Sequence, residues 1–243
     1  MTIKQAMVLA AGLGTRMRPI TDAIPKPLVK IDGKAMIDYA LDLLVEAGVE
    51  KAVVNVHHHA DQMLEHLRGY RRLEVIISDE RERLMNSGGG LAKGLKLLEP
   101  GNVFVTNADL FWIGERAGKP SNLRRLAGIF DPCSIDMAML CVNLEDTTGH
   151  NGKNDFNLSA DGKLNRYGED SQAPVVYAGA IAMNTAFLGD APAEPFNLNL
   201  YFDKAIARGR LFGMVLEGHW LTVGTPEAIG EAEETIRRYR TFA

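Results

Sequence analysis

A glycine-rich segment near the start of the chain carries the residues best suited to chemistry. Residues 9–16 read LAAGLGTR, and Lys26 follows between two prolines. Small residues and glycines at the end of a strand let the backbone approach a ligand closely, so its N–H groups can bind phosphate oxygens. Arg16 and Lys26 could supply positive charge to the same phosphates. The segment therefore predicts a phosphate-binding loop, although a Gly-x-Gly pair is also compatible with a plain tight turn.

Two common phosphate-binding signatures do not fit this segment. The dinucleotide fingerprint requires a third glycine that is missing here, and the P-loop requires a Gly-Lys-Ser/Thr ending that is also missing. The loop is therefore expected to belong to another class of phosphate-binding protein.

A single carboxylate follows an apolar strand later in the chain. Asp109 comes three residues after the run at 103–106, at the edge where open α/β sheets bind ligands. A carboxylate in that place suits Mg²⁺, which prefers oxygen ligands from one or two carboxylates and from phosphates. The alternative is an aspartate that stabilises a turn or caps a helix.

A triple glycine, Gly88 to Gly90, follows Ser87 and precedes an amphipathic stretch at 91–98 that predicts a helix. Glycine amides are not obstructed by a side chain, so they could contact a base and a ribose, and the Ser87 hydroxyl could contact the base. A structural turn is the alternative interpretation.

The order of these motifs resembles that of the sugar-phosphate nucleotidyltransferases, which join a nucleoside triphosphate to a sugar 1-phosphate and release pyrophosphate. The resemblance covers nearly the full length. The matching segments are AAGLGTRMRPIT at 10–21, PKPL at 25–28, Ser87–Gly90, Asn107–Asp109, Gly179 and GHWLTVGTP at 218–226.

The resemblance implies an α/β, Rossmann-like fold with a mixed, mostly parallel sheet between helices, and Mg²⁺ as cofactor. It also implies roles for individual residues. The catalytic residues would be Arg16, Lys26 and Asp109, with Asp109 as the metal ligand. The nucleotide would be bound by Ala10, Ala11, Gly12, Gly14, Thr15, Arg16, Lys26, Ser87, Gly88 and Gly89, and the sugar by Asn143, Asp155 and Gly179.

Three positions depart from the family's pattern. Ala108 replaces a common glycine, and Asn86 replaces a residue that is often acidic. The third departure is Thr222, where relatives commonly carry an aspartate that is the second carboxylate on the metal. A neutral hydroxyl is a poor substitute for a carboxylate on Mg²⁺. Either Asp109 suffices together with phosphates and water, or another acid takes part, or activity is reduced.

Within the family, the short chain, the triple glycine, the Asn-Asp-Phe at 154–156 and the ending at 218–226 resemble the uridylyltransferases of cell-wall recycling. The mannose 1-phosphate guanylyltransferases share many of these motifs. Thr222 favours a further alternative, a noncatalytic sugar-nucleotide sensor. An NAD-binding oxidoreductase is a third class, and the arginine and lysine of the phosphate loop disfavour it.

The elements that must position these residues follow from the hydrophobic pattern. Apolar runs at 6–10, 52–56, 73–77 and 103–106 alternate with amphipathic stretches, which predicts a parallel sheet with covering helices. After residue 131, strand-like runs dominate until a final helix at 226–240. We expect one nucleotidyltransferase domain over 1–243, with a nucleotide-binding part at about 1–130 and a sugar-binding elaboration at about 131–225.

The amino-acid composition indicates which kinds of molecule the protein could bind. The 243 residues include 27 Lys and Arg against 31 Asp and Glu, a net charge of −4, and two cysteines. A broad basic surface for nucleic acid or membrane is therefore not expected, and two cysteines in apolar surroundings suit a reduced cytoplasm. No segment has the pattern of a signal peptide or a membrane span. The expected partners are a nucleoside triphosphate and a sugar 1-phosphate, bound by a monomer or a small homo-oligomer.

Overall fold

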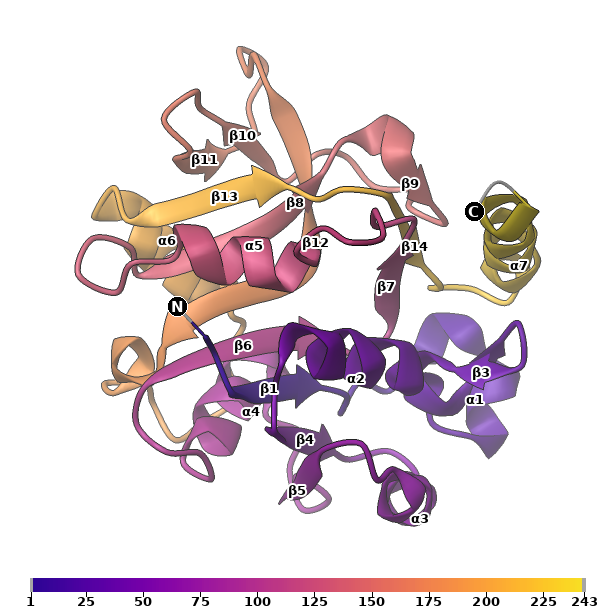
Figure 1. The fold of residues 1–243 in the computed structure, drawn as a ribbon. Coiled ribbons are helices and arrows are strands. Elements are labelled where there is room, and N and C mark those ends of the chain that lie inside the picture. Colours follow the sequence, from indigo (N-terminus) through magenta and orange to yellow (C-terminus); the bar gives the residue numbers. More distant parts are fainter. Residues whose placement is uncertain (1, 242–243) are drawn as a thin grey trace.

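The computed structural model describes residues 2–241, and its centre is a mixed sheet covered by helices (Figure 1). Within these residues the sheet has nine strands, and its main path runs β11-β10-β12-β6-β1-β4-β5. The predicted α/β, Rossmann-like fold is confirmed. The strands of the first half are parallel: β1 (Gln5–Leu9), β4 (Lys51–Val56), β5 (Glu74–Asp79) and β6 (Asn102–Asn107).

The strands of the second half extend the same sheet. β12 (Pro174–Asn184) lies antiparallel to β6 on one side and antiparallel to β8 (Met137–Val142) on the other. β13 (Leu211–Val215) adds to β8 in parallel, and a hairpin of β10 (Phe156–Leu158) and β11 (Leu164–Arg166) adds to the end of β12. Since β12 bridges β6 and β8, both halves of the chain form one continuous sheet.

Helices cover both faces of the sheet because successive side chains of a buried strand point to opposite faces. Val8 packs in one core and its neighbour Met7 in the other. The first core involves α2 (Met36–Ala47), α3 (Ala60–Gly69) and α5 (Asn122–Ile129), and the second involves α4 (Asn86–Leu95) and α6 (Asn199–Ala207). No helix of residues 2–241 combines the length and apolar character needed to cross a membrane.

A smaller sheet lies beside the main one, with β7 (Leu110–Ile113), β14 (His219–Thr222) and β9 (Thr147–Thr148) in that order. The helices α7 (Glu227–Thr241) and α1 (Ile20–Ala23) and the hairpin of β2 (Lys30–Ile31) and β3 (Lys34–Ala35) lie at the same end of the molecule (Figure 1). A third core joins these parts, with Met17, Phe111, Leu221 and Ile236 among its members. The C-terminal helix is thereby packed against the segment that follows the glycine loop.

Two helices differ from the expectation: α6 lies in the part of the chain that was expected to be mostly strands, and α4 begins at another residue. The predicted helix at 91–98 begins instead at Asn86, so the triple glycine lies inside the helix. Glycine has a low intrinsic helix propensity, and a sequence pattern therefore favours a loop there. Tertiary contacts of these glycines, described below, outweigh that preference.

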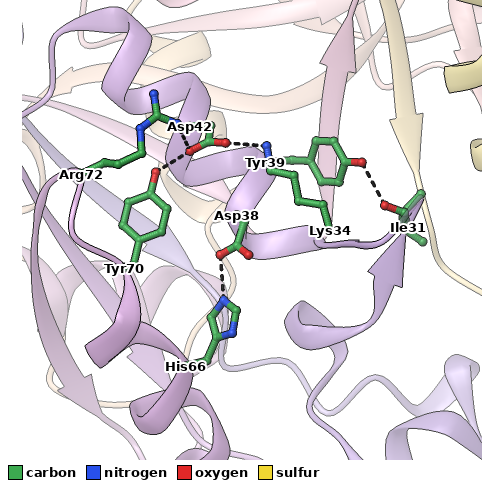
Figure 2. Close-up of polar contacts among 8 residues, drawn as sticks. All are labelled: Ile31, Lys34, Asp38, Tyr39, Asp42, His66, Tyr70 and Arg72. Atoms are coloured by element: carbon green, nitrogen blue, oxygen red, sulfur yellow. Dashed lines mark hydrogen bonds and ion pairs between the residues drawn. The ribbon is translucent and has the colours of Figure 1, made fainter. Parts of the chain in front are cut away.

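A polar cluster anchors α2 to its surroundings (Figure 2). The Asp42 carboxylate accepts hydrogen bonds from Lys34 Nζ at 2.5 Å, from the Tyr70 hydroxyl at 2.6 Å and from the Arg72 guanidinium. Burial by itself would raise the pKa of Asp42, but the bonds from Lys34 and Tyr70 and the charges of Lys34 and Arg72 outweigh it and lower that pKa. The cluster joins α2 to the β2–β3 hairpin and to the segment after α3.

Candidate active site

A cavity of about 310 Å³ opens where the carboxyl ends of β1, β4 and β6 meet the start of α4. Residues 9–12 of the glycine loop form one wall, and Leu84, Asn86 and Ser87 form another. Lys26, Pro27, Asn55 and residues 107–109 complete the lining. The cavity is therefore lined by the first residues of the glycine loop, the proline-flanked lysine and the strand-end aspartate that the sequence singled out, whereas Gly14 and Thr15 are not part of its lining.

The glycine loop has a conformation that requires Gly14. This residue has φ 63°, in the left-handed region, and a Cβ there would lie 2.9 Å from Thr21 Cγ2 and 3.0 Å from Lys26 Cβ. The Thr21 hydroxyl donates to the Gly14 carbonyl at 2.8 Å. A Cβ on Gly12 would meet nothing within 4 Å. The loop is thus fixed at Gly14 and leaves open space beside Gly12.

Lys26 and Asp109 meet inside the cavity. Lys26 begins a short 3₁₀ helix, Lys26–Leu28, directly after Pro25, and Asp109 lies two residues after the end of β6. Lys26 Nζ is 2.5 Å from Asp109 Oδ2, and the side chains are 11% and 37% exposed. A cation and a carboxylate are therefore held side by side, with the carboxylate more accessible than the ammonium.

Arg16 occupies a different place from the other predicted catalytic residues. Its side chain is exposed and is not part of the cavity lining. Its guanidinium lies next to Gly224, where an added Cβ would be 3.5 Å from a terminal nitrogen of Arg16. Thr15 is exposed in the same short 3₁₀ helix, Thr15–Met17. The structure therefore places Arg16 between the glycine loop and the segment after β14.

The triple glycine is used differently from the expectation. The amides of Gly88 and Gly89 both donate to the Phe196 carbonyl, at 2.9 and 3.2 Å, and are not free to contact a base or ribose. A Cβ on Gly88 would lie 2.3 Å from the Phe196 ring, so the absent side chain makes room for that ring. Ser87 does line the cavity, and its hydroxyl oxygen accepts a hydrogen bond from the Leu198 amide at 3.0 Å.

The three predicted sugar residues lie along the neighbouring strands and, in the described chain, outside the lining of this cavity. Asp155 Oδ2 accepts from the Tyr177 amide at 2.9 Å. Gly179 has φ 76° at an irregularity of β12, and a Cβ there would lie 2.5 Å from Leu110, the residue after Asp109. Asn143, after β8, donates to Asp146 at 3.3 Å. Gly179 therefore packs against the residue that follows Asp109.

Thr222 ends β14 directly opposite Leu110, so this position is adjacent to the Asp109 segment. No group of three or more His, Cys, Asp or Glu residues that could hold a metal is present among residues 2–241. Mg²⁺ is often held by one or two carboxylates together with substrate phosphates. The accessible Asp109 carboxylate lies in the same cavity as residues 9–12 of the glycine loop and would suit an ion of that kind.

Two buried polar residues at the site have no signal in the sequence. Asn55 is 3% exposed and lines the cavity, and Glu80 is 1% exposed and bonds to Asn55. Asn55 lies in a run that reads as a buried apolar strand, and Glu80 lies in a charged segment of the kind that is usually solvated. Only their contacts show that they belong to the site.

Comparisons with known proteins agree with this picture. Residues 5–115 match the family model described as nucleotidyl transferase. The N-acetylmuramate alpha-1-phosphate uridylyltransferase of Caulobacter vibrioides is 42% identical over 237 residues, which cover 96% of this chain and 97% of that protein. The mannose-1-phosphate guanylyltransferase catalytic subunit beta of Dictyostelium discoideum is 28% identical, over 92% of this chain and 62% of that protein. Among solved structures, a UDP-glucose pyrophosphorylase complexed with UDP-glucose superimposes with a TM-score of 0.76 at 20% identity, over 98% of this chain and 99% of that one.

Proposed function

Since this chain belongs to the sugar-phosphate nucleotidyltransferase family, we propose that it joins UTP to N-acetylmuramate 1-phosphate and releases pyrophosphate. The observation that carries the choice of substrates is the 42% identity to the Caulobacter uridylyltransferase along nearly the whole of both chains. The guanylyltransferase of Dictyostelium is less similar, at 28% identity. The reaction would serve the recycling of cell-wall sugar in the cytoplasm.

The proposed reaction is an in-line substitution at phosphorus. An oxygen of the sugar phosphate forms a bond to the α-phosphorus of UTP, and the bond from that phosphorus to the bridging oxygen of pyrophosphate breaks, with the electron pair leaving on pyrophosphate. Little covalent work falls to the protein, so the rate depends on positioning and on neutralising charge. The open backbone beside Gly12 and the Lys26 ammonium support both roles. Arg16, whose guanidinium lies beside Gly224, would hold the outer phosphates.

We propose Mg²⁺ as the metal, with Asp109 as its protein ligand. A divalent ion held by Asp109 would supply positive charge that offsets the charge developing on the phosphates. Asp109 suits this role because its side chain is 37% exposed and borders the cavity. Lys26 holds the Asp109 carboxylate in place by direct contact, and the same ammonium can donate to phosphate oxygens.

We assign the sugar to the second half of the chain, residues 131–225, and the nucleotide to residues 1–130 of one domain. The exposed Asp155 carboxylate could accept hydrogen bonds from sugar hydroxyls, while Gly179 allows close approach beside the Asp109 segment. Asn143 would add an amide contact. The assembly proposed is a monomer or a small homo-oligomer.

A pyrophosphate-release assay with four nucleoside triphosphates against several sugar 1-phosphates tests the function. We expect the highest kcat/KM with UTP and N-acetylmuramate 1-phosphate. Thr222 favours one other candidate, a noncatalytic sugar-nucleotide sensor, because the second carboxylate of relatives is absent. Binding of UTP by calorimetry without turnover of any pair would support the sensor and refute the enzyme.

A further inference from the structure

A chain of buried hydrogen bonds joins the two walls of the cavity. The Ala10 amide, in the glycine loop, donates to Asn55 Oδ1 at 2.6 Å. Asn55 Nδ2 donates to Glu80 Oε1 at 2.7 Å, and the Met85 amide, at the start of α4, donates to Glu80 Oε2 at 2.9 Å. These three hydrogen bonds therefore connect the cavity wall at 9–12 to the wall at 84–87 through the side chains of Asn55 and Glu80.

The side chains of Asn55 and Glu80 are so deeply buried that each depends on its hydrogen-bond partners within the protein. Asn55 is 3% exposed and Glu80 is 1% exposed. The Glu80 carboxylate is stabilised by hydrogen bonds from Asn55 Nδ2 and from the Met85 amide, which lies at the N-terminal end of α4. An unsatisfied polar group in such a place is costly, and that cost favours one arrangement of the two walls.

Gly90 shows how closely α4 approaches this pair. A Cβ on Gly90 would lie 2.7 Å from Asn55 Nδ2 and 2.8 Å from Glu80 Oε1. The third glycine of the triple-glycine segment thus makes room for the hydrogen-bonded pair, just as the first makes room for Phe196. The position of the helix is coupled to the pair by direct contact.

We propose that Asn55 and Glu80 are positioning residues for the nucleotide, which set the spacing between the glycine loop and the start of α4. This inference rests on the proposed function, because it takes the cavity to be the nucleotide site. Asn55 supplies one acceptor and one donor, and Glu80 supplies two acceptors. Each of the three hydrogen bonds therefore pairs one donor with one acceptor.

The order of donors and acceptors provides a test with isosteric variants. In Glu80→Gln, the new NH₂ group must face either Asn55 Nδ2 or the Met85 amide, so two donors oppose each other. In Asn55→Asp, two carboxylates face each other. The double variant Asn55→Asp/Glu80→Gln restores every bond, because the glutamine donates to the aspartate while both keep an acceptor for the Ala10 and Met85 amides.

We expect each single variant to raise the KM for UTP by at least about tenfold, the loss that one mispaired buried hydrogen bond produces. The KM for the sugar 1-phosphate should change by less than about twofold, because the proposal assigns that substrate to residues 131–225. The double variant should return the KM for UTP to within about threefold of the natural chain. A destabilised fold without a positioning defect would reduce the active fraction and leave both KM values unchanged.

Two outcomes would overturn the proposal: single variants with an unchanged KM for UTP, or a double variant no better than the worse single one. If a single variant does not fold, the double variant still tests the proposal, because the proposal requires the double variant to fold and to turn over substrate. Gly90→Ala, which pushes a methyl group onto the pair, should also raise the KM for UTP. Its matched control is Gly128→Ala in α5, where a Cβ meets nothing within 4 Å.

Hydrogen exchange separates this proposal from the proposed function. The Ala10 amide should be protected in the natural chain, lose protection in the single variants and regain it in the double variant. That pattern needs no nucleotide. If the Ala10 amide shows this pattern of protection but the protein turns over no nucleotide, the proposed function is refuted and the hydrogen bonds of Asn55 and Glu80 are supported. If the Ala10 amide exchanges equally fast in the natural chain and in all variants, the positioning role of Asn55 and Glu80 is refuted.

Discussion

Lys26 and Asp109, 83 residues apart in sequence, form a direct ion pair in which Lys26 Nζ lies 2.5 Å from Asp109 Oδ2. The pair joins the proline-flanked segment to the end of β6 and places opposite charges at one wall of the cavity. A triphosphate bound there would compete with Asp109 for the ammonium. Removing the Lys26 side chain and removing the Asp109 side chain should therefore have different effects on activity.

For Lys26→Ala we expect kcat/KM to fall by about 10²–10³-fold, because one charged donor aimed at developing charge contributes that much. Steady-state kinetics with UTP as the varied substrate measures the loss. Lys30→Ala, an exposed lysine in β2, is the control. A value near that of the natural chain would demote Lys26 to a structural partner of Asp109.

For Asp109→Ala we expect turnover to be abolished while the fold persists. The lost ion pair should lower the free energy of unfolding by only about 1.5–3 kcal/mol, as for a hydrogen bond to a charged group. Circular dichroism checks the fold, and calorimetry with Mg²⁺ and UTP checks metal-dependent binding. An active, folded variant would contradict the metal assignment. Asp61→Ala, whose side chain is 89% exposed, is the matched control.

Thr222→Asp should lower the Mg²⁺ concentration required for half-maximal activity by about tenfold, because a second carboxylate adds charge beside the Asp109 segment. Thr222→Val is the matched control, since it keeps the shape and removes the hydroxyl. If Thr222→Val raised the Mg²⁺ requirement, the threonine hydroxyl itself would be a ligand. The measurement is a metal titration of initial rates.

Gly88→Ala should lower the free energy of unfolding by about 1–3 kcal/mol, since its methyl group overlaps the Phe196 ring. Phe196→Leu in the same chain should recover part of that loss. Urea unfolding measures both, with Gly230→Ala, where a Cβ meets nothing within 4 Å, as the control. An unchanged stability with a raised KM for UTP would instead point to a direct role of Gly88 at the nucleotide.

Asp42→Asn should show a pH-dependent loss of stability. The pKa of Asp42 is lowered in the folded chain, because its bonds to Lys34 and Tyr70 and the nearby charges outweigh the effect of burial. Because the pKa of Asp42 is lower in the folded protein, its carboxylate stabilises the fold at pH values above the pKa of an unfolded aspartate, about 3.9. This stabilisation is lost as the pH falls through the pKa of Asp42 in the folded protein. We expect the variant to be less stable by about 1–2 kcal/mol at pH 7 and the difference to shrink below about pH 4. Urea unfolding across this range checks it, and a difference independent of pH would contradict it.

The sequence by itself determined the class of fold and the places where chemistry could occur. Alternating apolar runs specify buried strands because side chains alternate across a sheet, and residues at strand ends face one edge because parallel strands end together. For that reason the glycine loop and Asp109 could be predicted to lie at one edge of the sheet, and the resemblance to the family added Lys26 and Ser87. The structure places residues 9–12, Lys26, Ser87 and Asp109 around one cavity.

Only the tertiary structure decided which of these groups touch. The ion pair of Lys26 and Asp109 and the contact of Gly88 with Phe196 join residues more than 80 positions apart, and no local periodicity encodes such contacts. The triple glycine reads locally as a loop that binds a ligand, yet it lies in a helix because a phenylalanine ring and a buried hydrogen-bonded pair occupy the space of its missing side chains. The pairing of Asn55 with Glu80 is likewise decided by packing, since burial makes their hydrogen bonds specific.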